Sequence, residues 1–160
     1  MGQAASLALF IGVPIVQGMV GGLLTGKDVK DWFPTLKKPK WTPPDWAIGP
    51  LWSTFYTITG VASWLVLKHG GYSAQALPLG LCAAQYVFNF AWTPIFFKAR
   101  RLDIAFADVL VMLGFTGLAT IEYFKVSPAA GGLMTSYVAW QCFVAALNYR
   151  IWKDNQKVED

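Results

Sequence analysis

The sequence predicts an all-α integral membrane protein, built as a bundle of five transmembrane helices with an ordered first loop rich in Trp and Pro. Of its 160 residues, 55% are hydrophobic and 14% are charged, against about 25% charged residues in an ordinary soluble domain. Charged residues are absent from five stretches, residues 1–26, 46–67, 69–97, 109–121 and 126–149. Composition and charge distribution together argue against a soluble enzyme.

A helix needs roughly 20 residues to cross a bilayer. Each uncharged stretch, lengthened or shortened to about this length, predicts one span. The spans are residues 4–24, 47–67, 77–97, 104–124 and 130–151. No basic residue precedes the first apolar run, so we expect a retained helix there and not a signal peptide. Five spans account for nearly the whole sequence, which predicts a single transmembrane domain over residues 1–160.

Two carboxylates, Asp108 and Glu122, interrupt the fourth span near its ends. A carboxylate inside a membrane often serves a functional role such as proton transfer. Both residues lie close to basic residues, however, and we therefore predict structural ion pairs. Glu122 is expected to pair with Lys125, and Asp108 with one of three arginines: Arg100, Arg101 or Arg150.

Basic residues gather on one side of the predicted bundle. Eleven of the 13 Lys and Arg residues fall in the first loop, the third loop or the C-terminal tail: Lys27, Lys30, Lys37, Lys38, Lys40, Lys98, Arg100, Arg101, Arg150, Lys153 and Lys157. The positive-inside rule predicts that these segments are cytosolic. The net charge of +4 is thus a topological signal, compatible with contact to membrane lipid and not with a nucleic-acid partner.

The first loop is the most distinctive segment of the sequence. It carries Trp32, Trp41 and Trp46 among prolines at positions 34, 39, 43 and 44, which forbid a continuous helix. A Trp ring with its single N–H suits a membrane interface and equally the cover of a pocket. The residues leave two interpretations open, an aromatic belt at the interface or a structured lid over a ligand cavity.

Three of the predicted helices carry a stripe of aromatic and polar residues on one face. The stripes are Trp52, Tyr56, Thr59 and Ser63 on the second span, Gln85, Asn89, Trp92 and Phe96 on the third, and Tyr137, Trp140, Val144, Leu147 and Ile151 on the fifth. Amides in a hydrocarbon environment normally face the bundle interior. Gln85 and Asn89 are therefore expected either to bond neighbouring helices or to orient a ligand in an amphiphilic pocket.

Small residues at four-residue spacing predict close approach of helices, either within the bundle or between two copies. They are Gly18, Gly22 and Gly26 on the first span and Gly80 and Ala84 on the third.

Cys82 and Cys142 fall inside spans, where burial as small apolar side chains is expected in place of a disulfide. His69 has no neighbour at metal-ligand spacing, so we expect no metal and no required cofactor.

The segment from Leu147 to Lys153 fits the proposed cholesterol pattern of Leu or Val, then Tyr, then Lys or Arg. Leu147 and Tyr149 lie about 200° apart on a helix, so one flat sterol cannot easily touch the whole motif. We therefore predict two surfaces, an inward one through Trp140, Val144 and Leu147, and an outward, lipid-facing one through Tyr149, Trp152 and Lys153.

Several motifs, in their order along the chain, resemble those of the translocator protein family, also called peripheral benzodiazepine receptors or tryptophan-rich sensory proteins. The motifs are Trp41-Thr42-Pro43-Pro44-Asp45-Trp46, Gly49-Pro50-Leu51-Trp52, Leu79-Gly80-Leu81, Asn89-Phe90-Ala91-Trp92-Thr93-Pro94, Tyr137-Val138-Ala139-Trp140 and Leu147-Asn148-Tyr149-Arg150-Ile151-Trp152-Lys153-Asp154-Asn155. The resemblance extends over about residues 5–155. The later motifs look closer to the eukaryotic branch than to the bacterial one.

This resemblance implies a receptor or translocator of the mitochondrial outer membrane that binds cholesterol, porphyrins and other haem precursors, and benzodiazepine- or isoquinoline-type molecules. The implied ligand-binding residues are Trp32, Ile48, Trp52, Gln85, Asn89, Trp92, Tyr123, Trp140, Val144 and Leu147. The implied sterol-binding residues are Leu147, Tyr149, Arg150, Trp152 and Lys153, and the implied homodimer seam is Gly80 with Ala84.

Two alternatives to a binding protein stay open. One is a transporter or channel for cholesterol or porphyrin intermediates, although the sequence contains no internal repeat of the kind that many transporters use. The other is an enzyme that degrades bound porphyrin through Trp52 and Trp140, a role that only the resemblance suggests. The residue spacing shows no acid–base or nucleophilic machinery, so we expect binding without chemistry.

Overall fold

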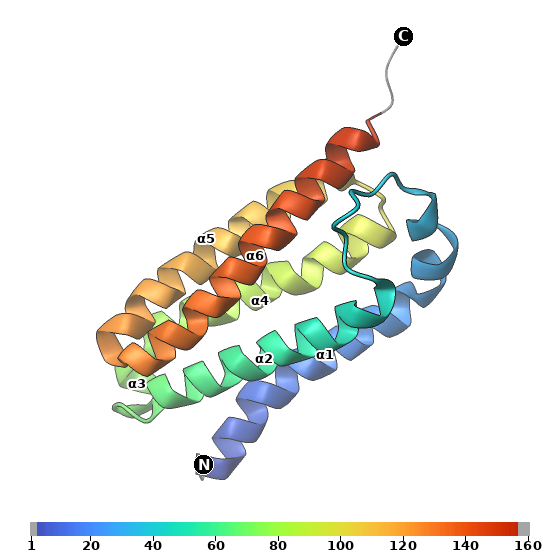
Figure 1. Cartoon of the computed structure of the whole chain (residues 1–160). Helices are drawn as coiled ribbons and strands as arrows, with labels where there is room; N and C mark the ends of the chain where they lie inside the picture. Colours follow the sequence, from blue (N-terminus) through green and yellow to red (C-terminus); the bar gives the residue numbers. More distant parts are fainter. Residues whose placement is uncertain (1–2, 157–160) are drawn as a thin grey trace.

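The computed structural model describes residues 3–156, and every regular element in that part of the chain is helical (Figure 1). The long helices are α1 (Gln3–Asp31), α2 (Asp45–Leu67), α4 (Ala76–Phe97), α5 (Leu102–Val126) and α6 (Pro128–Asp154). A 3₁₀ helix, η1 (Phe33–Thr35), and one short helix, α3 (Gly71–Ala74), lie in the connections. By length and composition, α1, α5 and α6 are apolar enough to cross a membrane. The prediction of an all-helical fold is confirmed.

The helix ends agree with the predicted spans to within three residues, with one exception. Helix α1 continues to Asp31, seven residues beyond the predicted end at Leu24. The added turns are charged and project past the apolar stretch, where the Asp28 carboxylate pairs with Lys98 at 2.6 Å and with Arg100 at 3.6 Å. The first loop is correspondingly shorter and comprises residues 32–44.

Local sequence explains where several helices begin and end. Pro128 is the first residue of α6, and the Ser127 hydroxyl before it accepts a hydrogen bond from the amide of Ala130 at 3.4 Å, a normal N-terminal cap. After α2 the chain turns through Gly70 and Gly71, whose φ angles of 104° and 79° lie in the left-handed region open to glycine.

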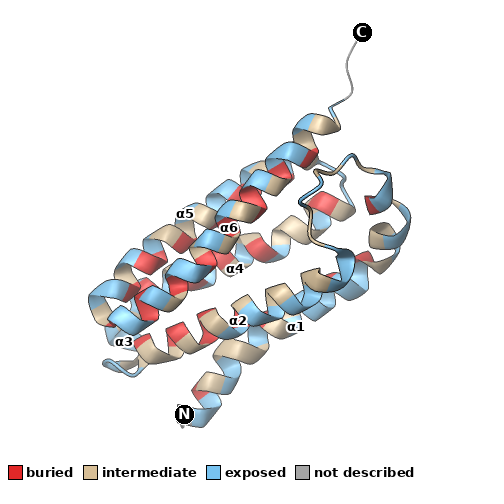
Figure 2. Ribbon diagram, in the orientation of Figure 1, coloured by how far each residue is buried: buried red, intermediate tan, exposed pale blue. Residues whose placement is uncertain are grey.

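The five long helices form a closed ring in the order α1, α2, α6, α5, α4, with α4 returning to α1. The closest associations are those of α5 with α4 and with α6, because short turns join these three consecutive helices. Among the long helices, α1 packs mainly on α2 and α4. Its outer face is exposed and apolar, with Val13, Val16 and Leu23 among the exposed side chains (Figure 2).

Two apolar clusters fill opposite ends of the ring. At the end away from the first loop the cluster contains Ala62, Val66, Cys82, Ala119, Tyr123, Ala130, Met134 and Tyr137. Under the first loop a second cluster contains Phe33, Phe96, Ala105 and Ile151. A third cluster around Val109 and Met112 lies beside α6. Figure 2 shows the buried residues lining the inside of the ring.

The basic residues do lie together in space. The first loop, the connection between α4 and α5, and the C-terminal end of α6 meet at one end of the bundle (Figure 1). The contact is direct, since the backbone amide of Lys37 donates to the Asn155 side chain at 2.9 Å. One of the eleven predicted basic residues, Lys157, lies outside the described residues.

The predicted ion pair of Asp108 is wrong. Each arginine pairs instead with another carboxylate at this end of the bundle, in the pairs Arg100–Asp28 at 3.6 Å, Arg101–Asp103 at 2.7 Å and Arg150–Asp154 at 3.2 Å. Asp108 is five residues farther into α5 than Asp103, about 7.5 Å along the axis. It is buried, and its Oδ2 atom has no hydrogen-bond partner among the described residues. The predicted Glu122–Lys125 pair is confirmed at 2.6 Å.

The small-residue and cysteine predictions are only partly correct. A Cβ atom on Gly18 would lie 2.9 Å from the Tyr56 ring, so α1 and α2 do approach closely there, but Gly22 and Gly26 meet nothing within 4 Å. The close contact of α1 with α4 uses Gly21, against Thr93. Cys82 is buried as predicted, whereas Cys142 is exposed on the outer face of α6.

Candidate functional site

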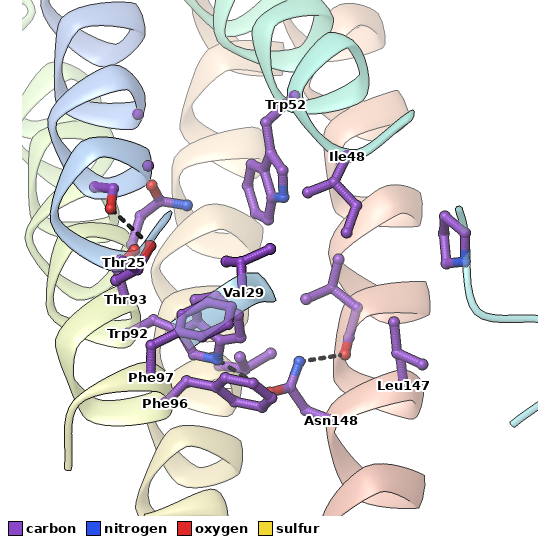
Figure 3. Close-up of a pocket in the computed structure, with 18 of the residues that line it drawn as sticks. Thr25, Val29, Ile48, Trp52, Trp92, Thr93, Phe96, Phe97, Leu147 and Asn148 are labelled. Carbon is purple, nitrogen blue, oxygen red and sulfur yellow. Dashed lines mark hydrogen bonds between the residues drawn. The ribbon is translucent and has the colours of Figure 1, made fainter. Parts of the chain in front are cut away.

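A cavity of about 410 Å³ lies inside the ring, between the two apolar ends. All five long helices and the first loop contribute to its wall (Figure 3). The lining residues are Ile15, Gly18, Met19, Gly21, Gly22, Thr25, Val29, Phe33, Thr42, Pro43, Asp45, Ile48, Gly49, Trp52, Ser53, Tyr56, Asn89, Trp92, Thr93, Phe96, Phe97, Val109, Met112, Trp140, Phe143, Val144, Leu147, Asn148 and Ile151.

Stacked aromatic rings form the wall between α2 and α6. The Trp140 ring stacks on Phe143 at 5.3 Å between centroids and on Phe55 at 5.2 Å, and it meets Trp52 edge-on at 6.0 Å. The Trp140 Nε1 atom is buried and has no hydrogen-bond partner among the described residues.

Asn89 on α4 contacts side chains of three other helices at the cavity wall, α1, α2 and α5. Its Oδ1 atom accepts hydrogen bonds from the Tyr56 hydroxyl at 2.7 Å and from Gln17 Nε2 at 3.1 Å, and its Nδ2 faces Met112 Sδ at 3.5 Å. The amide therefore bonds α4 to α1 and α2, as one of the two interpretations predicted. It also lines the cavity, with its orientation set by these partners.

A second amide, Asn148, lies deeper under the first loop. Its Oδ1 accepts from Trp92 Nε1 at 3.0 Å, and its Nδ2 donates to the Val144 carbonyl at 2.9 Å (Figure 3). These bonds hold the Trp92 indole against the Phe96 ring, with which it stacks at 4.7 Å. The amide thereby fixes an aromatic floor of the cavity at this end.

The first loop covers the cavity at the same end. Phe33 is buried against Phe96 and Phe97, at centroid distances of 6.1 and 5.9 Å. Farther along, Trp41 meets Phe143 edge-on at 5.4 Å. Trp46, in contrast, is 78% exposed and faces away. The loop itself therefore has the features of a cover over the cavity, whereas the exposed ring that fits an aromatic belt, Trp46, belongs to the first turn of α2.

The cavity wall is thin at the seam between α1 and α2. Met19 and Gly22 on α1 and Gly49 and Ser53 on α2 line the cavity and are also exposed on the outside of the bundle. Three of these four residues, Gly22, Gly49 and Ser53, are small, so little side-chain material separates the cavity from the surroundings there.

Seven of the ten predicted ligand-binding residues line this cavity, namely Ile48, Trp52, Asn89, Trp92, Trp140, Val144 and Leu147. The structure does not bring the other three, Trp32, Gln85 and Tyr123, to its wall. Trp32 packs behind the wall, edge-on to Phe96 at 5.7 Å, with the Arg100 guanidinium 5.2 Å from its ring.

Gln85 and Tyr123 lie beyond the closed end of the cavity. Gln85 is fully buried one turn below Asn89, and its Oε1 accepts from the Tyr137 hydroxyl at 3.2 Å. Tyr123 is also fully buried, with its hydroxyl 2.7 Å from the Ser63 hydroxyl. The helical face of Gln85 was predicted correctly, but the Tyr137 side chain occupies the space in front of it.

Sequence reasoning missed several lining residues. Asn148 carried a usable signal, because it is an amide inside a predicted span, four residues after Val144 on the inner face. Phe143 follows Trp140 by three residues and could have been found by the same spacing. The lining residues of α1 and α5, such as Ile15 and Val109, are ordinary apolar residues, and nothing in the sequence distinguishes them from the rest of their helices.

The predicted sterol residues lie on two sides of α6. Leu147 lines the cavity, whereas Tyr149, Arg150 and Lys153 are exposed. The outer group is ordered by ring contacts, with Trp152 stacked on Phe106 at 5.6 Å and the Lys153 ammonium 4.8 Å from the Trp152 ring centroid. The separation into an inner and an outer surface is therefore present in the structure.

The predicted dimer residues lie on the outer side of α4. Gly80 is exposed, and a Cβ atom there would meet nothing within 4 Å. Ala84 is half-buried on the same helix. Neither residue lines the cavity.

Comparison with known proteins gives one consistent result. The TspO/MBR family profile matches residues 10–153. The human translocator protein is 42% identical over 154 residues, which cover 95% of this chain and 86% of the human one. The tryptophan-rich protein TspO of Chlorobaculum tepidum is 31% identical over 155 residues, 96% of this chain and 98% of that protein. The tryptophan-rich sensory protein of Cereibacter sphaeroides is 34% identical over 125 residues, 78% of this chain and 77% of that protein.

The human relative thus shares more identities with this chain than either bacterial relative does, in agreement with the motif comparison. The family match also covers all five long helices in whole or in large part. The chain is an all-helical membrane protein that belongs to the TspO/MBR family.

Proposed function

We propose that this protein is a membrane receptor that binds apolar small molecules inside its helical ring. The observation that carries the proposal is the aromatic cavity of about 410 Å³, a volume within the roughly 300–1,000 Å³ range of sites for drug-sized ligands. The wall is mostly apolar and carries a few polar groups, among them the oriented side-chain amides of Asn89 and Asn148. This combination is the usual basis of affinity with specificity.

The charge of the wall favours uncharged ligands. Asp45 is the one charged residue among the lining residues in the described part of the chain, and it lies at the start of α2. Since burial of an unpaired charge is costly, an uncharged aromatic carboxamide suits the interior. A porphyrin suits it only with its carboxylates kept at an exposed edge, such as the seam beside Ser53.

Binding is proposed ahead of catalysis. Among the described lining residues only Asp45 and Tyr56 ionise, and the Tyr56 hydroxyl is bonded to Asn89. Transport is the second candidate, supported by the thin seam at Met19 and Gly22, through which an apolar ligand could exchange with lipid. For porphyrin degradation through Trp52 and Trp140, the supporting observation is the contact of the two rings, whose centroids are 6.0 Å apart.

The proposed setting is the mitochondrial outer membrane, with all five long helices crossing it. Ten described Lys and Arg residues at the first-loop end support a cytosolic position for that end and for the C-terminus.

A homodimer through Gly80 and Ala84 is proposed as well, because both residues lie outside the cavity and leave it clear. Animal relatives named translocator protein support the eukaryotic setting.

The direct test is a thermal-unfolding titration of purified protein in detergent with cholesterol, protoporphyrin and an isoquinoline carboxamide, each separately. A ligand that binds only the folded state at about 100 times its Kd raises the unfolding free energy by about 2.7 kcal/mol. We expect the unfolding midpoint to rise by about 5 °C or more for at least one ligand. The absence of a shift with all three ligands would refute the proposed binding function.

The two surfaces of α6 give a further prediction. Changing Tyr149→Ser together with Lys153→Ala should weaken cholesterol binding about tenfold, because the change removes the exposed ring and cation that face lipid. Binding of the isoquinoline carboxamide should change less than twofold, since neither residue lines the cavity. Equilibrium titrations of both ligands check this, and an equal loss of both in a folded variant would favour one continuous site.

A further inference from the structure

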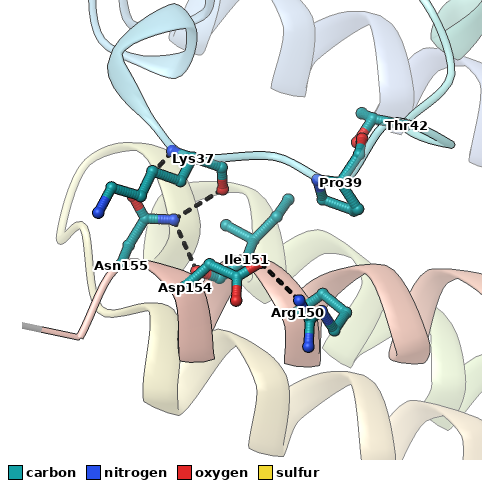
Figure 4. A network of polar contacts seen from close by, with 7 residues as sticks. All are labelled: Lys37, Pro39, Thr42, Arg150, Ile151, Asp154 and Asn155. Carbon is teal, nitrogen blue, oxygen red and sulfur yellow. Dashed lines mark hydrogen bonds and ion pairs between the residues drawn. The ribbon is translucent and has the colours of Figure 1, made fainter.

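The first loop is attached to the rest of the protein at three places. Phe33 is buried in the apolar cluster at its start, and Trp41 packs on Phe143 near its end. Between them the backbone of Lys37 is bonded to the side chain of Asn155, at the C-terminal end of α6 (Figure 4). The two residues are 118 positions apart in the chain.

The Asn155 amide is fully engaged in this contact. Its Oδ1 accepts from the Lys37 amide at 2.9 Å, and its Nδ2 donates to the Lys37 carbonyl at 2.8 Å. The second Nδ2 hydrogen is directed to the Ile151 carbonyl at 2.7 Å, a carbonyl in the last turn of α6 that has no later helical amide to bond. One side chain therefore closes the helix end and holds both polar groups of one loop residue.

The loop has no comparable anchor elsewhere. Between residues 33 and 43, its other hydrogen bonds in the described structure are local, such as Thr42 to the Pro39 carbonyl and Lys38 to the Phe33 carbonyl. Among the described residues, the two bonds with Asn155 are the hydrogen bonds that connect this segment to another part of the chain. Prolines at 39, 43 and 44 remove further backbone donors. The remaining attachments, at Phe33 and Trp41, are apolar.

We propose that Asn155 is a positioning residue that holds the first loop closed over the cavity and thereby sets how fast a bound ligand leaves. The link to the ligand is direct, because Phe33, Thr42 and Pro43, on either side of Lys37, line the cavity. This inference rests on the proposed binding function for its effect on ligand release. The attachment of the loop itself can be measured without any ligand.

The chemistry of the contact requires an amide at position 155. Asparagine presents an acceptor and a donor side by side, matched to the Lys37 N–H and C=O. Aspartate has the same shape, but when ionised it only accepts. Asn155→Asp therefore keeps the bond from the Lys37 amide while directing a carboxylate oxygen at two carbonyl oxygens, those of Lys37 and Ile151. Protonation of that carboxyl would restore a donor.

The experiment compares the wild-type protein with Asn155→Asp, and with Gln156→Glu as the matched control. Gln156 is the next residue and is exposed, so its variant makes the same amide-to-acid change without touching the loop. Hydrogen exchange of the Lys37 amide and its neighbours is measured without ligand at pH 7. Release of a radiolabelled isoquinoline carboxamide is then followed in the same detergent at pH 7 and at about pH 4.5, near the carboxyl titration range.

At pH 7 we expect Asn155→Asp to lower the protection of the loop amides from hydrogen exchange and to speed release of the carboxamide about tenfold. Gln156→Glu should match the wild type in both measurements. At about pH 4.5, the ratio of the release rate of Asn155→Asp to that of the wild type should fall back toward one. A general loss of structure would not produce this recovery. If the loop amides are equally protected in Asn155→Asp and in the wild type, Asn155 does not hold the loop. If the loop amides exchange faster but the ligand is released at the wild-type rate, Asn155 holds the loop but does not control ligand release. A wild-type protein that binds no ligand refutes the proposed function instead, while the exchange data still decide the attachment.

Discussion

Replacing Trp140 with Ala is expected to weaken binding of the isoquinoline carboxamide by about 2 kcal/mol, roughly 30-fold. The Trp140 ring connects the aromatic wall, since it contacts Trp52, Phe55 and Phe143. Its removal deletes a large apolar surface and leaves its neighbours free to shift into the space.

The measurement is an equilibrium titration on folded protein, with Trp46→Ala as the control. Trp46 is the same residue type, but it is 78% exposed and does not line the cavity. Its removal is expected to change the Kd less than twofold. Cholesterol binding at the outer surface of α6 should also survive Trp140→Ala. An unchanged Kd for the carboxamide in a folded Trp140→Ala protein would exclude Trp140 from the binding site.

Replacing Gly60 with Ala is expected to lower the free energy of unfolding by about 2–3 kcal/mol. Gly60 is buried where α2 crosses α1, and a Cβ atom there would lie 2.7 Å from Ile11 Cγ1 and 2.8 Å from the Phe10 carbonyl oxygen. The second neighbour is backbone, so relief requires the two helices to separate. The loss of contact along the crossing outweighs the better helix propensity of Ala, which is worth about 1 kcal/mol.

Gly114→Ala supplies the matched control for this substitution. Gly114 lies in the middle of α5, is exposed, and has nothing within 4 Å of a Cβ atom. Its replacement should leave the protein as stable as the wild type or slightly more stable. Unfolding followed by circular dichroism in detergent compares the two variants. Equal stability of both would mean that α1 and α2 do not meet as closely as the structure has them.

The helices and their inward faces could be predicted from the sequence with good accuracy. Uncharged stretches and turn residues located the long helices, and residue spacing selected the inner side of three of them. Tyr56, Asn89 and Val144 are all buried where the spacing placed them. These features depend on single segments, because helix length, helix ends and the direction of a side chain around its axis are local properties.

Contacts between segments were beyond the reach of the same reasoning. Asp108 has Arg100 and Arg101 near it in the sequence, yet these arginines pair with Asp28 and Asp103 instead. Asp28, in the added turns of α1, pairs with Lys98 and Arg100 after α4, and no property of the first 31 residues reveals these partners. Which ion pairs form depends on which charged side chains of different helices lie at the same level along the bundle axis.

Residue patterns along the chain were thus enough to predict the family, the helical architecture and most of the residues that face inward. The end of the cavity could not be predicted in this way, because it depends on side chains from different helices that compete for one space: Tyr137 bonds to Gln85, and the cavity reaches Asn89 but not Gln85. The tertiary structure alone decided that Asn155 meets Lys37, since a hydrogen bond across 118 residues is set by how the helices pack and not by any local pattern.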